Sequence, residues 1–271
     1  MTTAHSPSPA PASPASPPAP APPAGRPARA GRPAAGAVRA IALAELRMIV
    51  RNRTVAACAV LVPLGFGVLL LFLDGAGSAG VLAGLQIIGM VGMGVYVTVT
   101  TTLSARRQTL YLKRLRGGAV SDAGILAGVV LPVAAVSVAQ LVVVLGVLAL
   151  HDPPTHPLLL VVAVLAAEAM FVGLGLATAG ATTSPEHAQY TTLPVFVVAL
   201  GAAIWFQLTG VDELIAVKRL LPGGGLTELV ALAWDGGDLG LVPWLLLLPT
   251  LGWAAVGGLA ARRSFRWEPR R

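Results

Sequence analysis

The stretch RRQTLYLKRLRGG, residues 106–118, places five basic side chains within eleven consecutive positions. They are Arg106, Arg107, Lys113, Arg114 and Arg116. Only 11% of the 271 residues are charged, and long apolar runs lie on both sides of this stretch. Because Lys and Arg gather on the cytoplasmic side of a membrane, a dense cationic segment between two apolar runs indicates a cytoplasmic loop between two membrane spans.

The composition supports a membrane protein over a soluble one. The chain is 55% hydrophobic, with a mean hydropathy of +0.78. A soluble domain cannot hide that much apolar surface, since its exterior must stay in contact with water, whereas a bilayer can. The only cysteine, Cys58, lies in an apolar run, which excludes a disulfide framework and a cysteine-based metal site.

Six apolar runs are long enough to cross a bilayer core, which takes about 20 helical residues. They are residues 55–73, 81–103, 124–150, 158–180, 191–209 and 241–261, and each lacks Lys and Arg. The predicted fold class is therefore an all-α polytopic membrane protein with six transmembrane helices, multi-pass in the cell membrane and in contact with its lipids.

The positions of the basic residues predict the orientation. Of the 19 Lys and Arg residues, seven precede Thr54, five lie in the stretch quoted above and five lie in residues 262–271. Six spans put these three regions on one side, with only Lys218 and Arg219 on the other. Both termini are therefore expected to be cytoplasmic. Topology accounts for the net charge of +7, so we expect no nucleic-acid partner.

Four segments are not expected to span the bilayer. Residues 1–36 are rich in Pro and Ala and predict a disordered cytoplasmic tail. Residues 37–54 predict an amphipathic interfacial helix, in which Glu45 falls on the apolar side and should face protein or pair with an arginine. Residues 211–236 predict two short helices that lie at the outer interface or re-enter the membrane, and residues 262–271 a basic cytoplasmic tail.

Polar residues at membrane depth are candidates for function. They are Gln86, Gln140 and Glu168. Two interpretations stay open for them: hydrogen bonds that pack helices together, or a lining for the path of a transported substrate. The pairs Gly80/Gly84 and Gly124/Gly128 have the small-xxx-small spacing that permits close helix approach in lipid.

Two short motifs resemble chemical sites without their usual context. GAGSAG, residues 75–80, has the spacing of a dinucleotide-binding loop but joins two apolar spans instead of a strand and a helix. HDPPTHP, residues 151–157, offers His151, Asp152 and His156 as metal ligands, yet its prolines favour a plain turn. We expect an outer turn in each place, with no metal and no cofactor.

The chain lacks the lysine of an ATP-binding P-loop. That loop needs Gly-Lys-Ser/Thr, because its lysine must reach the phosphates. Here Lys113 follows Leu112 and Lys218 follows Val217. We therefore expect no enzymatic activity and no ATP hydrolysis in this polypeptide.

Residues 37–271 resemble the permease subunits of ABC-2 type exporters. The most specific part is ARRQTLYLKRLRGGAVSDAGILAGVVLPVAAVSVAQLVVVL, residues 105–145. The family usually has Thr-Pro-Leu after the arginine, where this chain has GGAV, residues 117–120. SPEHAQYTTLPVFVVALGAAIW (184–205) resembles the family's inner loop and fifth span, and LLPGGGLTELVALAW (220–234) its outer re-entrant pair.

The resemblance implies half of an exporter, a homodimer or a heterodimer with a second permease. Each copy would dock a separately encoded ABC subunit that binds ATP and Mg²⁺. Residues 104–122 would form the coupling segment, a stiff protruding helix that contacts this subunit. Its coupling residues would be Arg106, Arg107, Tyr111, Lys113, Arg114, Leu115 and Arg116.

Alternatives remain open at this level. An ion-coupled secondary transporter could use Glu168 as its carrier, although such proteins usually contain an internal repeat, and none is evident here. A membrane enzyme would need clustered His, Asp or Glu within the spans. A scaffold or sensor subunit is a further alternative. The sequence does not specify a substrate.

Overall fold

The computed structural model describes residues 34–51, 53–72, 77–118, 120–237, 239–265 and 267, without the side chains of 34, 49, 50 and 53–59. The chain divides into Met1–Gly31 and Arg32–Arg271, and the description concerns the second unit. Most of the expected tail at residues 1–36, and much of the expected tail at 262–271, lie outside the described residues.

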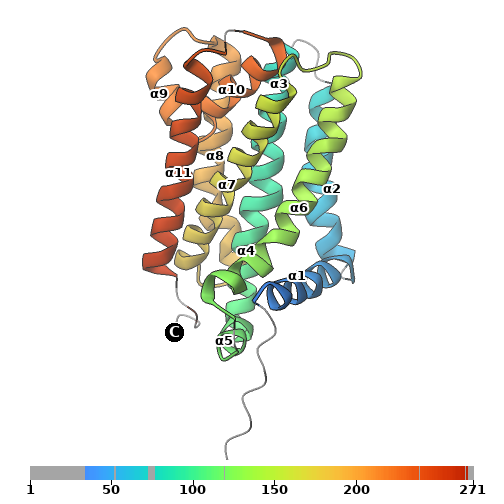
Figure 1. Cartoon of the computed structure of the whole chain (residues 1–271), viewed down its shortest axis with the longest axis vertical. Coiled ribbons are helices and arrows are strands. Elements are labelled where there is room, and N and C mark those ends of the chain that lie inside the picture. Colours follow the sequence, from blue (N-terminus) through green and yellow to red (C-terminus); the bar gives the residue numbers. More distant parts are fainter. Residues whose placement is uncertain are drawn as a thin grey trace, which may run out of the picture. The chain divides into compact units, whose positions relative to one another are not determined.

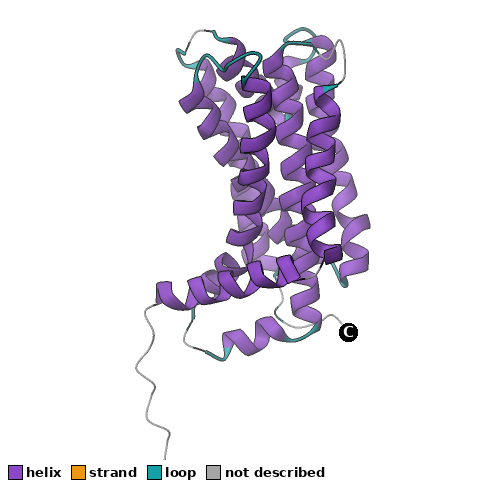
Figure 2. Cartoon of the chain, turned by 90° about the vertical axis from the view of Figure 1, so that its right-hand side faces the viewer, coloured by secondary structure: helices purple, strands orange, loops and turns teal. Residues whose placement is uncertain are grey.

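Every regular element in the described residues is a helix, as Figure 2 shows. Five helices are long and apolar enough to cross a membrane, which confirms the prediction of a helical polytopic membrane protein. They are the continuous helix Ala79–Gln108, α6 (Asp122–Ala149), α7 (Pro157–Ala181), α8 (Pro185–Thr209) and α11 (Val242–Ser264). Ala79–Gln108 consists of α3 (Ala79–Val91), a π-helical segment η1 (Gly92–Val97) and α4 (Thr98–Gln108).

The first expected span, residues 55–73, corresponds to α2 (Arg53–Leu71), which packs against α3 and α6 (Figure 1). Within the described side chains its apolar part is Val60–Leu71, which is shorter than a membrane crossing. The described residues thus support five spans, and the count of six stays a prediction.

Serine side chains set where three of the helices begin. The hydroxyls of Ser78, Ser121 and Ser184 accept hydrogen bonds from the backbone N–H groups three residues later, at the starts of α3, α6 and α8. Such N-caps satisfy a donor that would otherwise lack a partner. Pro185 follows Ser184 and suits a first helical turn. For this reason α8 begins six residues before the predicted start of the fifth span at residue 191.

Four non-spanning helices lie at the two ends of the bundle (Figure 1). At one end, α1 (Ala34–Arg51) runs across the ends of the spans, beside α5 (Tyr111–Arg116). At the other end lie α9 (Ile215–Leu220) and α10 (Gly224–Asp235), within the segment 211–236. Most residues of α10 are buried, because it packs against α3, α7 and α11. We call these the α5 end and the α10 end.

The glycine pairs noted in the sequence bring helices into close contact. A Cβ atom on Gly80 would lie 2.8 Å from the Cα of Ala231, and one on Gly84 would lie 2.7 Å from Thr227. Both residues therefore face α10. A Cβ atom on Gly128 would lie 2.8 Å from the Cβ of Ile41, so this glycine lets α1 approach α6. The partners of both pairs are non-spanning helices.

A close backbone-to-backbone contact joins α7 to α11 through glycines that the sequence analysis did not single out. A Cβ atom on Gly257 would lie 2.4 Å from the carbonyl carbon of Gly173. A Cβ atom on Gly173 would lie 2.6 Å from the carbonyl oxygen of Ala254. Because the obstructing atoms are backbone, no side-chain rotation could make room.

We expect Gly257→Ala to destabilise the bundle, since the added methyl group forces α7 and α11 apart. Overpacking of this kind costs roughly 1–3 kcal/mol. The thermal midpoint of the purified chain in lipid nanodiscs, followed by tryptophan fluorescence, should fall by several degrees. Gly258→Ala is the matched control, because a Cβ atom there has nothing within 4 Å. Equal midpoints for the two variants would contradict this close contact.

Candidate coupling surface and intramembrane polar groups

The basic stretch forms a bent connection between two spans. The helix that crosses the membrane ends at Gln108, and a turn through Thr109 and Leu110 leads into the short helix α5. Leu110 has φ 57°, in the left-handed region that a side chain with a Cβ atom disfavours by roughly 1–2 kcal/mol. The expected stiff helix over residues 104–122 is therefore two helices with a sharp turn between them.

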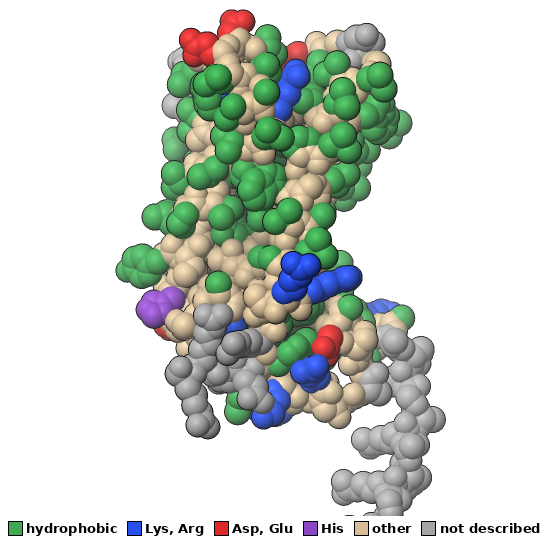
Figure 3. Space-filling model, turned by 90° about the vertical axis from the view of Figure 1, so that its left-hand side faces the viewer, with side chains coloured by type: hydrophobic (Ala, Val, Ile, Leu, Met, Phe, Trp, Pro, Cys, Tyr) green, Lys and Arg blue, Asp and Glu red, His purple; other side chains and the backbone are tan. Residues whose placement is uncertain are grey.

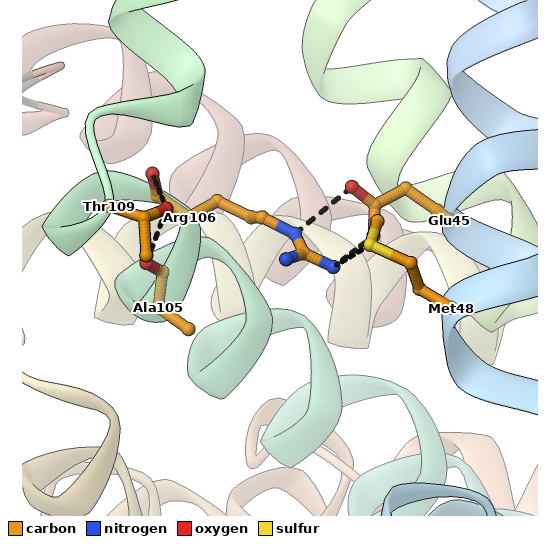
Figure 4. Close-up of polar contacts among 5 residues, drawn as sticks. All are labelled: Glu45, Met48, Ala105, Arg106 and Thr109. Carbon is orange, nitrogen blue, oxygen red and sulfur yellow. Dashed lines mark hydrogen bonds and ion pairs between the residues drawn. The ribbon is translucent and has the colours of Figure 1, made fainter. Parts of the chain in front are cut away.

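Arg106 joins this connection to the interfacial helix. Its Nη2 donates to Oε2 of Glu45 at 2.8 Å and its Nε donates to Oε1 at 3.1 Å, a two-pronged ion pair drawn in Figure 4. The Glu45 side chain is only 2% exposed. The expectation that Glu45 would face protein or pair with an arginine is confirmed, and the ion pair ties α1 to the end of α4.

Tyr111 and Met48 complete the surroundings of this ion pair. The guanidinium carbon of Arg106 lies 5.5 Å from the centre of the Tyr111 ring, and its Nη2 contacts the sulfur of Met48 at 3.3 Å. Burial, reinforced by the negative charge of Glu45, raises the pKa of the Tyr111 hydroxyl. Tyr111 therefore stays neutral and covers one face of the cation.

Arg107 points away from the surface and into the bundle. Its side chain is buried, and its guanidinium donates to the backbone carbonyl oxygens of Ala179, at 2.9 Å, and of Thr182. These carbonyls end α7, where a cation also balances the negative end of the helix dipole. The expectation that Arg107 is presented to a partner is not met in this conformation, because its side chain joins α4 to α7.

The cations that do reach the surface lie on and beside α5. Lys113, Arg114 and Arg116 are exposed, Leu115 is half-buried, and Leu112 is fully buried against the bundle. Arg116 pairs with Asp122 at 3.1 Å, and its guanidinium carbon lies 5.1 Å from the ring centre of Trp267. On the face drawn in Figure 3, hydrophobic side chains cover the spans, and most visible Lys and Arg side chains gather near the α5 end.

The three polar residues predicted at membrane depth are all buried, and the neighbours of Gln86 and Glu168 can be named. Gln86 is fully buried in α3 and its side-chain nitrogen donates to the carbonyl oxygen of Gly67 in α2 at 3.1 Å, which is a helix-packing role. Glu168 is buried near the middle of α7, and the hydroxyl of Ser137 in α6 lies close enough to interact with its carboxyl group. Gln140 is buried one turn from Ser137 on α6.

At the α10 end, both basic residues bind groups of the chain itself. Lys218 is buried, and its ammonium donates to Oγ1 of Thr209 at 2.6 Å and to the carbonyl oxygen of Gly210 at 2.9 Å. It thus binds the end of α8 much as Arg107 binds the end of α7. Arg219 donates through Nε to Glu228 at 2.7 Å, and this hydrogen bonding raises the pKa of Arg219. Sequence reasoning recorded these cations but not their partners.

The two motifs that resemble chemical sites serve as structural connections. Asp235 accepts hydrogen bonds from Oγ of Ser78 at 2.6 Å and from the backbone N–H of Gly80 at 2.9 Å, so a carboxylate of α10 occupies the start of α3. The backbone carbonyl of Asp152 accepts from Nε1 of Trp234 at 2.9 Å. Among the described residues, no group of three or more His, Cys, Asp or Glu side chains could hold a metal ion.

Comparison of the chain with protein-family models, with curated proteins and with solved structures gives no match. The resemblance carried by residues 105–145 accordingly stays a prediction.

Substitutions at the Glu45–Arg106 pair should have unequal effects. Arg106→Gln leaves a carboxylate that is 2% exposed without its cation, whereas Glu45→Gln leaves an arginine that is 25% exposed and can turn to water. We expect Arg106→Gln to lower the free energy of unfolding by on the order of 3 kcal/mol, and Glu45→Gln by less. The double variant should recover part of the loss.

The measurement is the thermal midpoint, together with the rate of limited proteolysis within α1. Arg47→Gln, at an exposed position of the same helix, is the matched control and should change neither quantity. Equal effects of the two single substitutions would contradict the expectation that the buried carboxylate, left without its cation, accounts for most of the loss of stability.

Proposed function

We propose that this chain is the transmembrane permease subunit of an ABC-2 type exporter, driven by ATP that a separate ABC subunit binds and hydrolyses. Five long apolar helices make the chain a multi-pass membrane protein. The observation that carries the proposal further is the cationic surface of α5, where Lys113, Arg114 and Arg116 project beside Leu115. A surface of this kind suits docking to a soluble protein whose cleft is acidic and apolar.

The contacts behind this surface give a physical route for force. A partner that moves α5 would also move α4, because only the turn at Thr109 and Leu110 separates them. Arg107 would pass that movement to the end of α7, and Arg106 would pass it to α1. The surface therefore connects to α4 through the backbone, and α4 connects to α7 and to the interfacial helix α1 through charge-assisted hydrogen bonds.

The direction of movement would come from the partner. ATP can shift a conformational equilibrium only by binding one state of the complex more tightly than the other. In the proposed assembly, closure of the ABC subunits on ATP would favour one position of α5. The spans would then reorient between two packed arrangements. The permease would work as a pair, homodimeric or with a second permease.

One observation favours a second candidate, the ion-coupled secondary transporter. Glu168 is a buried carboxyl group at membrane depth, which is where such transporters place a proton or ion carrier. Within the described spans it is the only Asp or Glu away from the terminal turns. The described spans therefore offer no second carboxyl group at membrane depth that could pass a proton or ion to or from Glu168. For this reason we rank this candidate second.

The test is purification of the tagged full-length chain from its native membranes in mild detergent. We expect a protein with a Walker A lysine and an ABC signature loop to co-purify in a stoichiometric amount, and the complex to hydrolyse ATP. A chain that purifies alone and transports cargo in proteoliposomes without ATP would contradict the proposal and favour the second candidate.

Charge reversal on α5 tests the surface itself. We expect Lys113→Glu combined with Arg114→Glu to reduce the recovered ABC subunit and the ATPase rate at least about tenfold. The attraction between basic side chains of α5 and an acidic partner surface would become repulsion between like charges. Arg262→Glu combined with Arg263→Glu is the matched control, since these exposed residues of α11 lie at the same end and change the charge equally. Equal losses in both double variants would mean that general charge, and not α5, matters.

A further inference from the structure

The carboxyl group of Glu168 is a strongly buried polar group that the proposed coupling route does not use. Glu168 is the twelfth of 25 residues in α7, and 6% of it is exposed. Neither carboxyl oxygen has hydrogen-bond geometry with another described residue, and the same holds for Oγ of Ser137. These two side chains nevertheless lie close enough to interact. Two helices thus turn neighbouring oxygen atoms toward one point inside the bundle.

The π-helical segment η1 lies at this same point. A Cβ atom on Gly94 would lie 3.8 Å from Oγ of Ser137, and one on Gly92 would lie 3.6 Å from the ring of Phe171, one turn from Glu168. The ring of Tyr96 lies 6.0 Å from that of Phe171 between centres. Single π-turns within α-helices occur frequently at functional sites. Ser137 therefore lies beside η1, and so does Phe171, which is one turn from Glu168 on α7.

The described part of the bundle provides no cation at this depth. In the five described spans, every other Asp, Glu, Lys, Arg or His lies in a first or last helical turn. Arg107 is held by the end of α7. An ionised carboxylate without a cation is costly in a membrane interior. A ligand that brings its own positive charge would relieve that cost.

We propose that Glu168 and Ser137 bind the protonated amine of a hydrophobic substrate, which rests on the exporter function proposed above and assigns its substrate class. An ammonium group offers N–H donors to the carboxylate and to the hydroxyl, and charge-assisted hydrogen bonds of this kind are the strong ones. Phe171, one turn from Glu168 on α7, and Tyr96 near it add aromatic rings to this region, and the faces of such rings attract alkylammonium groups. A hard metal ion fits poorly, because Ca²⁺ requires six to eight oxygen ligands.

The test is direct binding to the full-length chain in lipid nanodiscs, without any ATP-binding partner. The probe is dansylcadaverine, a hydrophobic fluorophore whose primary amine is protonated at pH 7, and its uncharged N-acetyl derivative is the reference. We expect fluorescence titration to show tighter binding of the amine. Glu168→Gln, which keeps the shape and removes the charge, should weaken amine binding about tenfold or more while leaving the acetylated probe unchanged.

Two further variants sharpen the result. Ser137→Ala should weaken amine binding by a smaller factor, since it removes a neutral hydrogen-bond acceptor. Glu213→Gln removes the same charge at an exposed position near the α10 end and should bind as the unmodified chain does. Equal binding of both probes, no binding of either, or unchanged amine binding by Glu168→Gln would each overturn the proposal. The proposed exporter function depends on co-purification of an ABC subunit and would survive any of these results.

Discussion

A charge or a helix-ending backbone carbonyl that is buried away from water must find its partner within the protein. This constraint explains the placement of the most buried cations. Arg107 binds the carbonyl oxygens that end α7, and Lys218 binds those that end α8. In each case a long side chain from a neighbouring segment supplies donors where a helix has run out of its own. The same contacts fix how the spans are placed relative to the segments outside them.

The two ends of the bundle apply this constraint differently. At the α5 end Lys113, Arg114 and Arg116 stay exposed, as do Arg47, Arg262 and Arg263, so that end keeps a strong positive charge at its surface. At the α10 end both cations bind groups of the chain itself: Lys218 donates to a backbone carbonyl group, and Arg219 pairs with Glu228. The difference in exposed positive charge between the two ends is therefore larger than the numbers of Lys and Arg residues at each end suggest.

Glycines let the non-spanning helices pack closely against the spans, since Gly80 and Gly84 face α10 and Gly128 faces α1.

Much of the fold could be predicted from the sequence because hydropathy and helix length are strongly linked in a membrane. Five of the six predicted spans begin within two residues of the start of a helix that the structure describes. A carboxylate among apolar residues in an amphipathic helix also predicted that Glu45 would face protein or pair with an arginine, but it did not distinguish the two or indicate which arginine. Arg107 was predicted wrongly as a surface residue, because neighbouring arginines in a sequence give no sign of which one turns inward. The contact of Gly173 with Gly257 was missed, since 31 glycines obscure any single pair.

The π-helical segment η1 has a bearing on how this chain tolerates change in length. Each residue of an α-helix turns it by about 100°, so one extra residue in a turn rotates everything after it by roughly that amount. Upstream of η1, Gly80 and Gly84 face α10, and downstream of it Thr100 and Arg107 face α7. The two halves of one span are thus phased independently. Natural variants that lose or gain a single residue in this region would exchange the neighbours of half a helix, a far larger disturbance than any one side chain produces.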